Sequence, residues 1–516
     1  MNDSRVTVGE AGGSDPAVHP APLIVWAGLA LLDAQAAPRA QSGVCIVGER
    51  VVDVGSRDDL CARYPAATLV GGEDMLLLPG LINSHDHGRG LSTLALGVTD
   101  DLLELWLLGL SALPAVDPYK LALIEGVNLL RSGVTATAHS HNPADWTAMA
   151  VESASTLLGY AETGIRVAYH PPYIDQNVLV YADRDAFLAG LPDDVRALAA
   201  PFLRLPALGI DGYLALCSDL YARHHDAAGQ RVHIQVSPAG GQWCSDELML
   251  ACRDWAVAHG TRVQMHFLET VYQERYAYRR WGKSFLRHLE EIDMLGPWLT
   301  LAHMIWVEEA DIPLLQAHGV AIAHNPSSNL RIRSGLAPLA AYHAAQLPIG
   351  IGLDGYALDD DQDYLRELRM AWTLGNRPGA SAPTLAPADI LHMGTAGGAA
   401  VTFGAGAPLG RLQAGMLADL VLVDWRAVEG VWVSALTPPQ HLLLRRATRE
   451  HVRDVMVAGE WVVRGGRSTR IDEAALLDEV RADLVRAASS QSDQGIQAAR
   501  ALAPYLRRFY AHWEAA

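Results

Sequence analysis

Two histidines two residues apart follow an apolar run near the start of the chain. His85 and His87 come directly after the largely apolar residues 78–82, with Asp86 between them and Gly88 behind them. Residues two apart on a strand point to the same face of a sheet. The spacing therefore predicts that both imidazoles face one interior, where they can bind a metal ion.

Three further histidines and one aspartate end later strand-like runs. His266, His303 and His324 each stand at the carboxyl end of such a run, and Asp354 ends the next one. Parallel strands bring their carboxyl ends together at one face, where active sites form. Imidazoles together with a carboxylate suit a borderline divalent ion such as Zn²⁺ or Fe²⁺. The pattern predicts a metal-dependent active site at this face.

Glu269 follows His266 by three residues, just beyond the end of the same run. A carboxylate in that place can reach a substrate while the histidine holds metal. Glutamate can carry protons between an activated water and a leaving nitrogen. The alternative use is a plain charge on an exposed loop.

Lysine is rare in this chain, which contains only Lys120 and Lys283. Neither lies in the expected fourth strand, residues 231–236, and that run has no Asp or Glu. Nothing there could bridge a second metal as a carboxylated lysine or a carboxylate would. We therefore expect a mononuclear site with one divalent ion per chain, Zn²⁺ first, with Fe and Mn as alternatives.

The residues that carry this chemistry lie in a long middle segment, residues 79–402, in which strand-like and helix-like stretches alternate. Repeated βα units indicate a parallel sheet covered by helices. The pattern predicts an α/β fold, a (β/α)8 TIM barrel, with a doubly wound open sheet as the alternative. No G-x-G-x-x-G opens a helix after a strand, which disfavours the dinucleotide-binding form of the open sheet.

Short β-type runs occupy both sides of the middle segment, in residues 21–78 and 403–470. Two small β-rich segments far apart in sequence predict one composite β-sandwich domain built from both chain ends. Residues 1–20 are expected to form a mobile leader. Residues 471–516 are expected to form amphipathic C-terminal helices that pack on the body or contact a second copy in a homo-oligomer.

Composition narrows the possible partners. The formal net charge of −18 argues against nucleic acid and anionic membranes, because phosphate binding needs a basic face. Five cysteines without CxxC spacing indicate reduced thiols rather than a disulfide framework. The apolar stretch 22–32 is too short to span a bilayer and lacks a basic segment before it. We expect a cytoplasmic enzyme with a small-molecule substrate.

Several features fit more than one role. His139 and His141 end the second expected strand and either border the pocket or serve the structure. Arg331 and Arg333 either meet an anionic group or lie on a solvated loop. The acidic run 359–363 is solvated, supports the site or meets a basic substrate. Aromatic residues could line a pocket for a planar ring or pack in the core: Trp106, Tyr173, Trp243, Trp306 and Tyr356.

Taken together, the motifs resemble the amidohydrolase superfamily, in its branch of cytosine, guanine and adenosine-type deaminases and triazine hydrolases. The resemblance covers nearly the whole chain after the leader and rests on residues 79–87, 266–269, 301–303, 323–329 and 352–355. It implies a (β/α)8 barrel with a composite β-sandwich, in agreement with the expectation above.

The resemblance also implies a role for each residue. The implied metal ligands are His85, His87, His266 and Asp354. His303 would orient the substrate or the attacking water, and Glu269 would be the proton shuttle. Asp354 would also take the proton of the water, whereas His324 would shape the pocket without binding metal.

Three functions remain open at this point. The first is metal-dependent deamination of an amino-substituted nitrogen heterocycle. The second is hydrolysis of an amide, urea or carbamate-like C–N bond, or of another ring substituent, with the same site. Residues 355–358 and 237–243 differ from the usual pattern of the branch and keep the second function open. The third is a non-catalytic scaffold, which the presence of every implied ligand disfavours.

Overall fold

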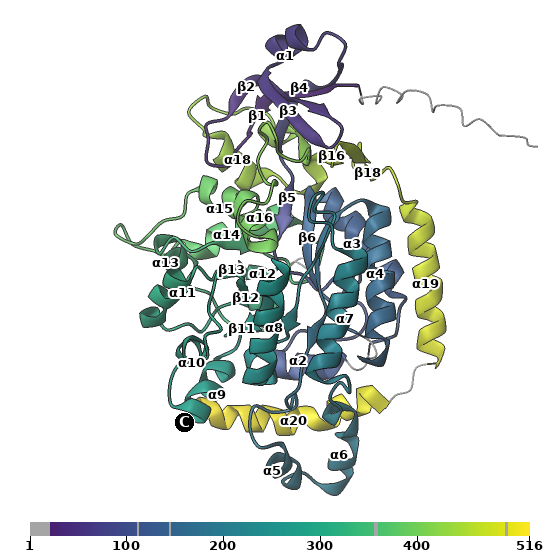
Figure 1. Cartoon of the computed structure of the whole chain (residues 1–516), viewed down its shortest axis with the longest axis vertical. Helices are drawn as coiled ribbons and strands as arrows, with labels where there is room; N and C mark the ends of the chain where they lie inside the picture. The colour runs from purple at the N-terminus through teal and green to yellow at the C-terminus, as the bar shows by residue number, and fades with distance from the viewer. Residues whose placement is uncertain (1–20, 111–112, 144–145, 356–359, 491–493, 516) are drawn as a thin grey trace, which may run out of the picture.

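The structure is a computed structural model that describes residues 21–110, 113–143, 146–355, 360–490 and 494–515. It is an α/β protein, with a β-rich end above a larger body of strands and helices (Figure 1). The expected leader, residues 1–20, lies outside the described residues. Among the described helices, none is both long enough and apolar enough to cross a membrane.

Two parallel sheets of four strands lie at the centre of the body. Every residue of these eight strands is buried, apart from one residue in each of two strands, Val232 and His266. Burial on both faces explains their largely apolar sequences. The first sheet contains β5 (Leu81–Asn83), β6 (Val134–Ser140), β7 (Arg166–His170) and β9 (Val232–Ile234). The second contains β11 (Val263–Phe267), β12 (Leu299–His303), β13 (Ala321–His324) and β14 (Ile349–Ile351).

The two sheets are joined at both of their edges. On one side, the backbone N–H of Ser84, just after β5, donates to the carbonyl oxygen of Ile351 in β14 at 2.8 Å. On the other side, Val236 forms a parallel bridge with Val263, the first residue of β11. Because all these strands are parallel, the histidine-bearing carboxyl ends of both sheets lie at one face.

Helices between the strands cover the outside of the sheets (Figure 1). Helix α3 (Pro118–Arg131) begins after Asp117, whose side chain accepts a hydrogen bond from the N–H of Tyr119, and it packs against α4 (Met149–Thr163). Helix α4 ends at Gly164 in the left-handed conformation, φ 84°, which glycine adopts without strain. Such caps turn the chain back into the next strand.

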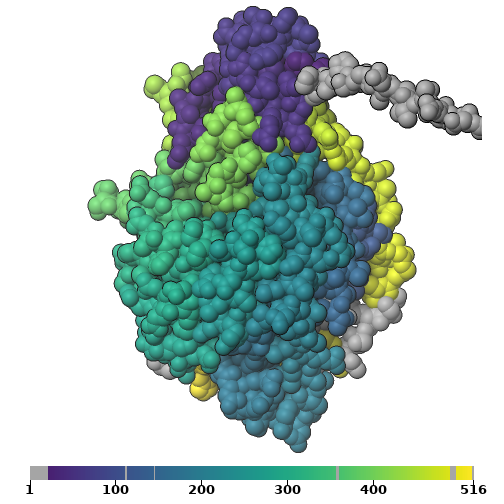
Figure 2. All heavy atoms as spheres, viewed as in Figure 1, coloured from purple at the N-terminus to yellow at the C-terminus, as the bar shows by residue number. Residues whose placement is uncertain are grey.

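Both ends of the chain meet in one mixed sheet of eight strands. Its central strand β4 (Thr68–Pro79) pairs in parallel with β1 (Leu23–Ala30) and antiparallel with β15 (Leu420–Asp424). The remaining strands are β2 (Arg39–Val47), β3 (Arg50–Ser56), β16 (Val452–Val457), β17 (Glu460–Arg464) and β18 (Arg467–Ser468). Figure 2 shows the N-terminal segments and later residues packed together at this end. The expected pairing of the two chain ends is therefore present.

Strand β4 leads directly into the centre of the body. Gly80 links it to β5, and a Cβ atom at this position would lie 2.1 Å from Oγ1 of Thr135, so only glycine fits there. His85 and His87 follow within seven residues. The sheet at the chain ends thus fixes the start of the segment that carries both histidines.

The last two helices wrap the body. Helix α19 (Glu473–Ser490) packs on α3, and Asp483 on α19 forms an ion pair with Lys120 on α3 at 2.8 Å. Helix α20 (Gln494–Ala515) packs on α2 (Leu103–Leu110) and on α6 (Asp193–Leu198). Figure 1 shows α19 along one side of the body and α20 across its lower end, with α5 (Arg184–Ala189) and α6 beyond it.

Candidate active site

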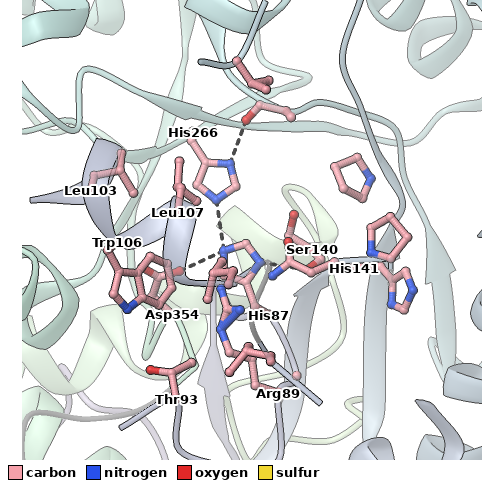
Figure 3. A pocket seen from close by; sticks show the side chains of 18 of the residues that line it. His87, Arg89, Thr93, Leu103, Trp106, Leu107, Ser140, His141, His266 and Asp354 are labelled. Atoms are coloured by element: carbon pink, nitrogen blue, oxygen red, sulfur yellow. Dashed lines mark hydrogen bonds and ion pairs between the residues drawn. The ribbon is translucent and has the colours of Figure 1, made fainter. Parts of the chain in front are cut away.

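Five of the predicted site residues come together at the carboxyl ends of the strands, and Figure 3 labels three of them, His87, His266 and Asp354. His85 and His87 follow β5, His266 lies in β11, His303 ends β12 and Asp354 follows β14. These residues come from both parallel sheets. Their meeting therefore depends on the joined edges described above.

The ligand atoms of these residues are close together. Nε2 of His85 and Nε2 of His87 lie 3.2 and 3.1 Å from Oδ1 of Asp354. Nε2 of His266 lies 3.1 Å from Nε2 of His87, and Nε2 of His303 lies 3.9 Å from Oδ2 of Asp354. Ligand atoms of His85, His266, His303 and Asp354 all fall within 4.8 Å of one another. By distance alone, His303 belongs to the cluster as much as His87 does.

Backbone carbonyls fix the orientation of two of the rings. Nδ1 of His87 lies 2.9 Å from the carbonyl oxygen of Ser140, and Nδ1 of His266 lies 2.7 Å from that of Ala239. A carbonyl oxygen only accepts, so we infer that each Nδ1 carries the hydrogen and each neutral Nε2 presents a lone pair. These two lone pairs face each other at 3.1 Å. Such an arrangement calls for a cation or a proton between them.

A buried amide fixes the ring of His85. The side-chain N–H of Gln264 donates to the carbonyl oxygen of Ser84 at 3.1 Å, which turns Oε1 of Gln264 toward Nδ1 of His85 at 2.7 Å. Nε2 of His85 and Oδ1 of Asp354 are both buried without a hydrogen-bond partner. Histidines that bind metal are commonly held in this way through the other ring nitrogen. The residues present therefore fit a divalent metal ion.

Asp354 is held as a carboxylate. Burial alone would raise its pKa, but the nearby imidazoles of His85 and His87 lower the pKa well below its ordinary value. Ser328 donates a further hydrogen bond from Oγ to Oδ2 of Asp354. The negative charge of Asp354 is thus available to a cation.

His303 sits between two carboxyl groups. Its Nδ1 is 3.0 Å from Oδ1 of Asn329, and its buried Nε2 lies 3.7 Å from Oε2 of Glu269 as well as near Asp354. The left-handed backbone of His303, φ 74°, is unusual for a residue other than glycine. Such strain is found where a structure holds a side chain in a functional place.

Glu269 is buried beside the cluster and lines the same cavity. Its exposed fraction is 2%, so the alternative of an exposed loop charge does not apply. Burial, with smaller contributions from Asp354 and Glu104, raises the pKa of Glu269 well above its ordinary value. A raised pKa favours the protonated form of this carboxyl, the form that a general acid needs.

The two lysines are engaged elsewhere. Lys120 pairs with Glu479 and Asp483 on α19, and Lys283 pairs with Glu291. His324 is buried in β13 and does not join the group of ligand atoms within 4.8 Å.

A cavity of about 680 Å³ opens beside the cluster. The cluster forms one wall. Another part of the lining, which we call the recognition wall, comes from α2, the segment after β5 and the segment after β6. It includes the apolar residues Leu103, Trp106 and Leu107 and the polar residues Arg89, His141 and Asn142. Figure 3 shows several of these side chains around the cluster. Trp106 and Trp243 line the cavity as the sequence allowed, whereas Tyr356 lies outside the described residues.

His139 at the end of β6 and His141 just after it belong to a hydrogen-bonded chain at the edge of the cavity. Nδ1 of His139 lies 2.7 Å from the hydroxyl of Tyr160, and Nε2 of His139 lies 3.4 Å from Nδ1 of His141. Nε2 of His141 then meets a carboxylate oxygen of Glu152 at 3.0 Å. Both histidines line the cavity, so the first of their two possible locations is the observed one.

The two arginines considered for an anionic group are paired within the protein. Arg331 lies 3.1 Å from Asp100 and 3.2 Å from Asp360, and Arg333 lies 3.5 Å from Asp101. The acidic run of residues 359–363 thus contributes a partner to Arg331, although residue 359 itself lies outside the described residues.

Sequence reasoning missed three residues of the site. Gln264 stands two residues before His266, and Arg89 stands two residues after His87. The same-face spacing that marked the histidines could have marked both. Glu104, buried on α2 at the cavity, gave no such signal, because nothing in its helix distinguishes it from a surface carboxylate.

Comparison with known proteins identifies the family of the chain. A model of the amidohydrolase family matches residues 76–462, and a model of the bacterial imidazolonepropionase-like composite domain matches residues 43–67. The 5'-deoxyadenosine deaminase of Methanosarcina barkeri is 27% identical over 85% of this chain and 91% of its own length. The 5-methylthioadenosine/S-adenosylhomocysteine deaminase of Nitratidesulfovibrio vulgaris is 29% identical over 90% and 96%.

Solved structures share the fold. An adenosine deaminase from Xanthomonas campestris with bound zinc has a TM-score of 0.76 and 25% identity, over 91% of this chain and 99% of that one. Atrazine chlorohydrolase from Arthrobacter aurescens, complexed with zinc, has a TM-score of 0.75 and 23% identity, over 90% and 100%. The family match covers well over half of the sequence and includes every residue of the metal cluster. The chain belongs to the amidohydrolase family.

Proposed function

We propose that the protein is a metal-dependent aminohydrolase that deaminates an amino-substituted nitrogen heterocycle. The observation that carries this proposal is the arrangement of imidazole lone pairs, the Asp354 carboxylate and the buried Glu269 carboxyl beside one cavity. Deamination by water needs an activated water, a group that takes its proton and a group that protonates nitrogen. The named activities of the relatives, deaminases of adenosine derivatives, support the same reaction class.

The proposed ligands of one divalent ion are His85, His87, His266 and Asp354. This donor set suits Zn²⁺, with Fe and Mn as alternatives. The solved structures of the adenosine deaminase from Xanthomonas campestris and of atrazine chlorohydrolase contain zinc. When bound, the ion supplies Lewis-acid activation of water near neutral pH.

The protein's own residues handle the protons. Asp354, whose Oδ2 accepts a hydrogen bond from Ser328, takes a proton from the attacking water. Glu269 gives its proton to the ring nitrogen beside the carbon that is attacked. The proton taken from water then passes to the amino nitrogen, which leaves as ammonia. The remaining proton of the added hydroxyl returns to Glu269, so the product carries a carbonyl and both carboxyl groups are restored. His303, 3.7 Å from Glu269 and 3.9 Å from Asp354, orients the water and the developing charge.

The finer architecture belongs to the same proposal. We infer that the two sheets, joined at both edges, close into the (β/α)8 barrel of residues 79–402. The sheet from the chain ends, residues 21–78 and 403–470, would be the composite β-sandwich. All five cysteines are free thiols, which fits an enzyme of the cytoplasm.

Product analysis tests the proposed reaction. The metal-loaded protein should release ammonia from at least one member of a panel of aminopurines, pterins, aminotriazines and cytosine, and the ring product should carry oxygen in place of the amino group. The protein freed of metal by a chelator should release none, and readdition of Zn²⁺ should restore the rate. An amine or acid fragment from cyclic ureas or amides, without ammonia from any aminoheterocycle, would contradict deamination and favour C–N bond hydrolysis.

A further inference from the structure

Arg89 places a positive charge in the wall of the cavity. It follows His87 by two residues, is half-buried and lines the cavity together with Trp106 and Asn142. The guanidinium carbon lies 5.1 Å from the centre of the Trp106 ring. Figure 3 shows Arg89 next to His87 with Trp106 at its side. The cation is therefore held by stacking within reach of the space beside the metal cluster.

The hydrogen-bond donors of Arg89 are only partly used. With its amide oxygen turned toward the arginine, Asn142 accepts from Nη1 and Nη2 at 3.0 Å each. A guanidinium carries five N–H donors. Asn142 accounts for two of these, and no further hydrogen bond or ion pair of Arg89 is found among the described residues, although the carboxylates of Asp354, Asp86 and Glu125 act on it electrostatically. Donors left over in a mainly apolar cavity call for a partner from a ligand.

Another buried arginine shows how this protein pairs such a group when it serves structure. Arg166 is fully buried, and its Nε and Nη2 donate to the two carboxylate oxygens of Asp419 at 2.7 and 2.8 Å. Arg331 at the cavity is likewise paired, with Asp100 and Asp360. Arg89 stacks on Trp106 and is half-buried, but no ion pair with a carboxylate is found for it among the described residues.

We propose that Arg89 binds a carboxylate group of the substrate, which would make the substrate an amino-substituted heterocycle that carries a carboxylate. Two N–H donors of a guanidinium match the two oxygens of a carboxylate. A single negative charge fits better than a phosphate dianion, because acidic side chains also line the cavity, among them Asp100, Glu104 and Glu152. The identity of the heterocycle rests on the proposed function, whereas the carboxylate rests on Arg89 alone.

The position of Arg89 also limits where the carboxylate lies. Arg89 and His87 leave the same short segment after β5 and line the same cavity. A Cβ atom at Gly355, the residue after Asp354, would lie 3.6 Å from Nε of Arg89. The arginine thus lies against the residue that follows a metal ligand. The carboxylate should therefore be attached to the heterocycle directly or through a short link.

Binding to matched ligands tests the proposal without turnover. The probes are pterin with pterin-6-carboxylate and cytosine with cytosine-5-carboxylate, each measured by calorimetry on metal-loaded Glu269→Gln protein. At least one carboxylated probe should bind more tightly than its neutral partner. Arg89→Gln should weaken that probe about 10- to 100-fold, the range for a lost charge-assisted pair, and change its neutral partner by less than about threefold.

Two further variants separate recognition from folding. Arg89→Lys keeps the charge without the paired donors and should retain part of the preference. Arg333→Gln removes an exposed arginine that does not line the cavity and should leave the preference unchanged. All variants should keep their metal content and melting temperature close to those of the parent.

Several outcomes would overturn the proposal. One is that no carboxylated probe binds better than its neutral partner. Another is that Arg89→Gln weakens both members of a pair equally, which would assign Arg89 a structural role near Asp86 and Glu125. Ammonia release from neutral heterocycles without any carboxylate preference would remove this inference and keep the proposed function. A carboxylate preference without ammonia release from any compound would do the reverse.

Discussion

The cluster of four histidines and Asp354 and the recognition wall border one cavity but are built differently. The cluster residues stand at strand ends, and their rings are held by buried acceptors such as Ser140, Ala239 and Gln264. The recognition wall is carried by α2 and by segments that follow strands, and its members Arg89, Trp106 and Leu107 are half-buried. Chemistry is thus set on rigid elements and selectivity on elements that can vary.

The recognition wall depends on the far end of the chain. Helix α2 packs on α20, where Tyr510 and Trp513 are buried. Arg507 of α20 forms an ion pair with Asp101, just before α2. The cluster residues lie instead at or just after strands of the two central sheets. We therefore expect changes in the cluster to alter metal binding and changes in the recognition wall to alter substrate binding.

The largest expected effect is the loss of a ligand. His85→Ala removes a donor from a buried cluster, and we expect metal content to fall toward zero and activity to fall to the background rate. His233→Ala is the matched control, because His233 is buried in β9 outside the cluster and the cavity. Elemental analysis together with an ammonia assay measures both. Full metal retention in His85→Ala would show that His85 is not a ligand.

The second effect concerns proton transfer. Glu269→Gln keeps the shape of the side chain but cannot deliver a proton, so kcat should fall about 10²–10⁴-fold with a smaller change in KM. The metal content should stay at the parental value. Glu274→Gln, a half-buried glutamate that does not line the cavity, should stay close to the parent in kcat. Turnover of Glu269→Gln near the parental rate would remove the shuttle and leave Asp354 alone with the protons.

The third effect sharpens the role of the buried acceptors. Gln264→Leu leaves Nδ1 of His85 without its acceptor, and metal affinity should fall about 10–100-fold. Gln235→Leu removes another buried glutamine, which donates to the carbonyl oxygen of Thr402 rather than to the cluster. Competition with a chelator measures the affinity. Equal metal affinities in the two variants would contradict the orienting role of Gln264.

The smallest expected effect on catalysis concerns Glu104 of α2, whose protonation changes the stability of the protein with pH. Burial raises the pKa of Glu104 from 4.5 to about 7, against the hydrogen bond from Thr270 that lowers it. The folded state therefore holds this proton more tightly than the unfolded state, so stability from Glu104 is complete below pH 4.5 and is lost as pH rises through about 7. The corresponding free energy is about 3 kcal/mol.

Glu104→Gln mimics the protonated side chain and should remove this dependence. Between pH 5 and pH 8 the parent should lose stability that the variant keeps. The free energy of unfolding of the variant minus that of the parent should therefore increase from pH 5 to pH 8. Denaturant titrations at the two pH values measure the difference. Parallel pH profiles for parent and variant would show that Glu104 does not carry the effect.

The metal cluster was accessible from the sequence because it follows a simple period. His85 and His87 lie just after β5, and His266, His303 and Asp354 lie at or just after the ends of β11, β12 and β14, so the shared direction of these strands brings them to one face. The association of the two chain ends was predicted in the same way, from short β-type runs that lacked partners nearby. The pairing of β4 with both β1 and β15 confirms it.

The recognition wall could not be predicted in this way. Leu103, Leu107 and Trp106 read as an ordinary apolar helix, and only the packing of α20 shows which side faces the cavity. Arg331 was considered for an anionic group, whereas Arg89 was not. The carboxylates that pair with Arg331, Asp100 and Asp360, lie far from it in sequence. Long-range ion pairs of this kind leave no local pattern.

The central claim is that the strand-end cluster is a mononuclear metal centre. Its most direct test is the metal content of the protein purified without chelators, measured by elemental analysis against protein concentration. The account predicts one divalent ion per chain, because the proposed ligands His85, His87, His266 and Asp354 lie together as one donor set and Lys120 and Lys283 are paired elsewhere. Two ions per active chain, or full activity with none, would contradict it.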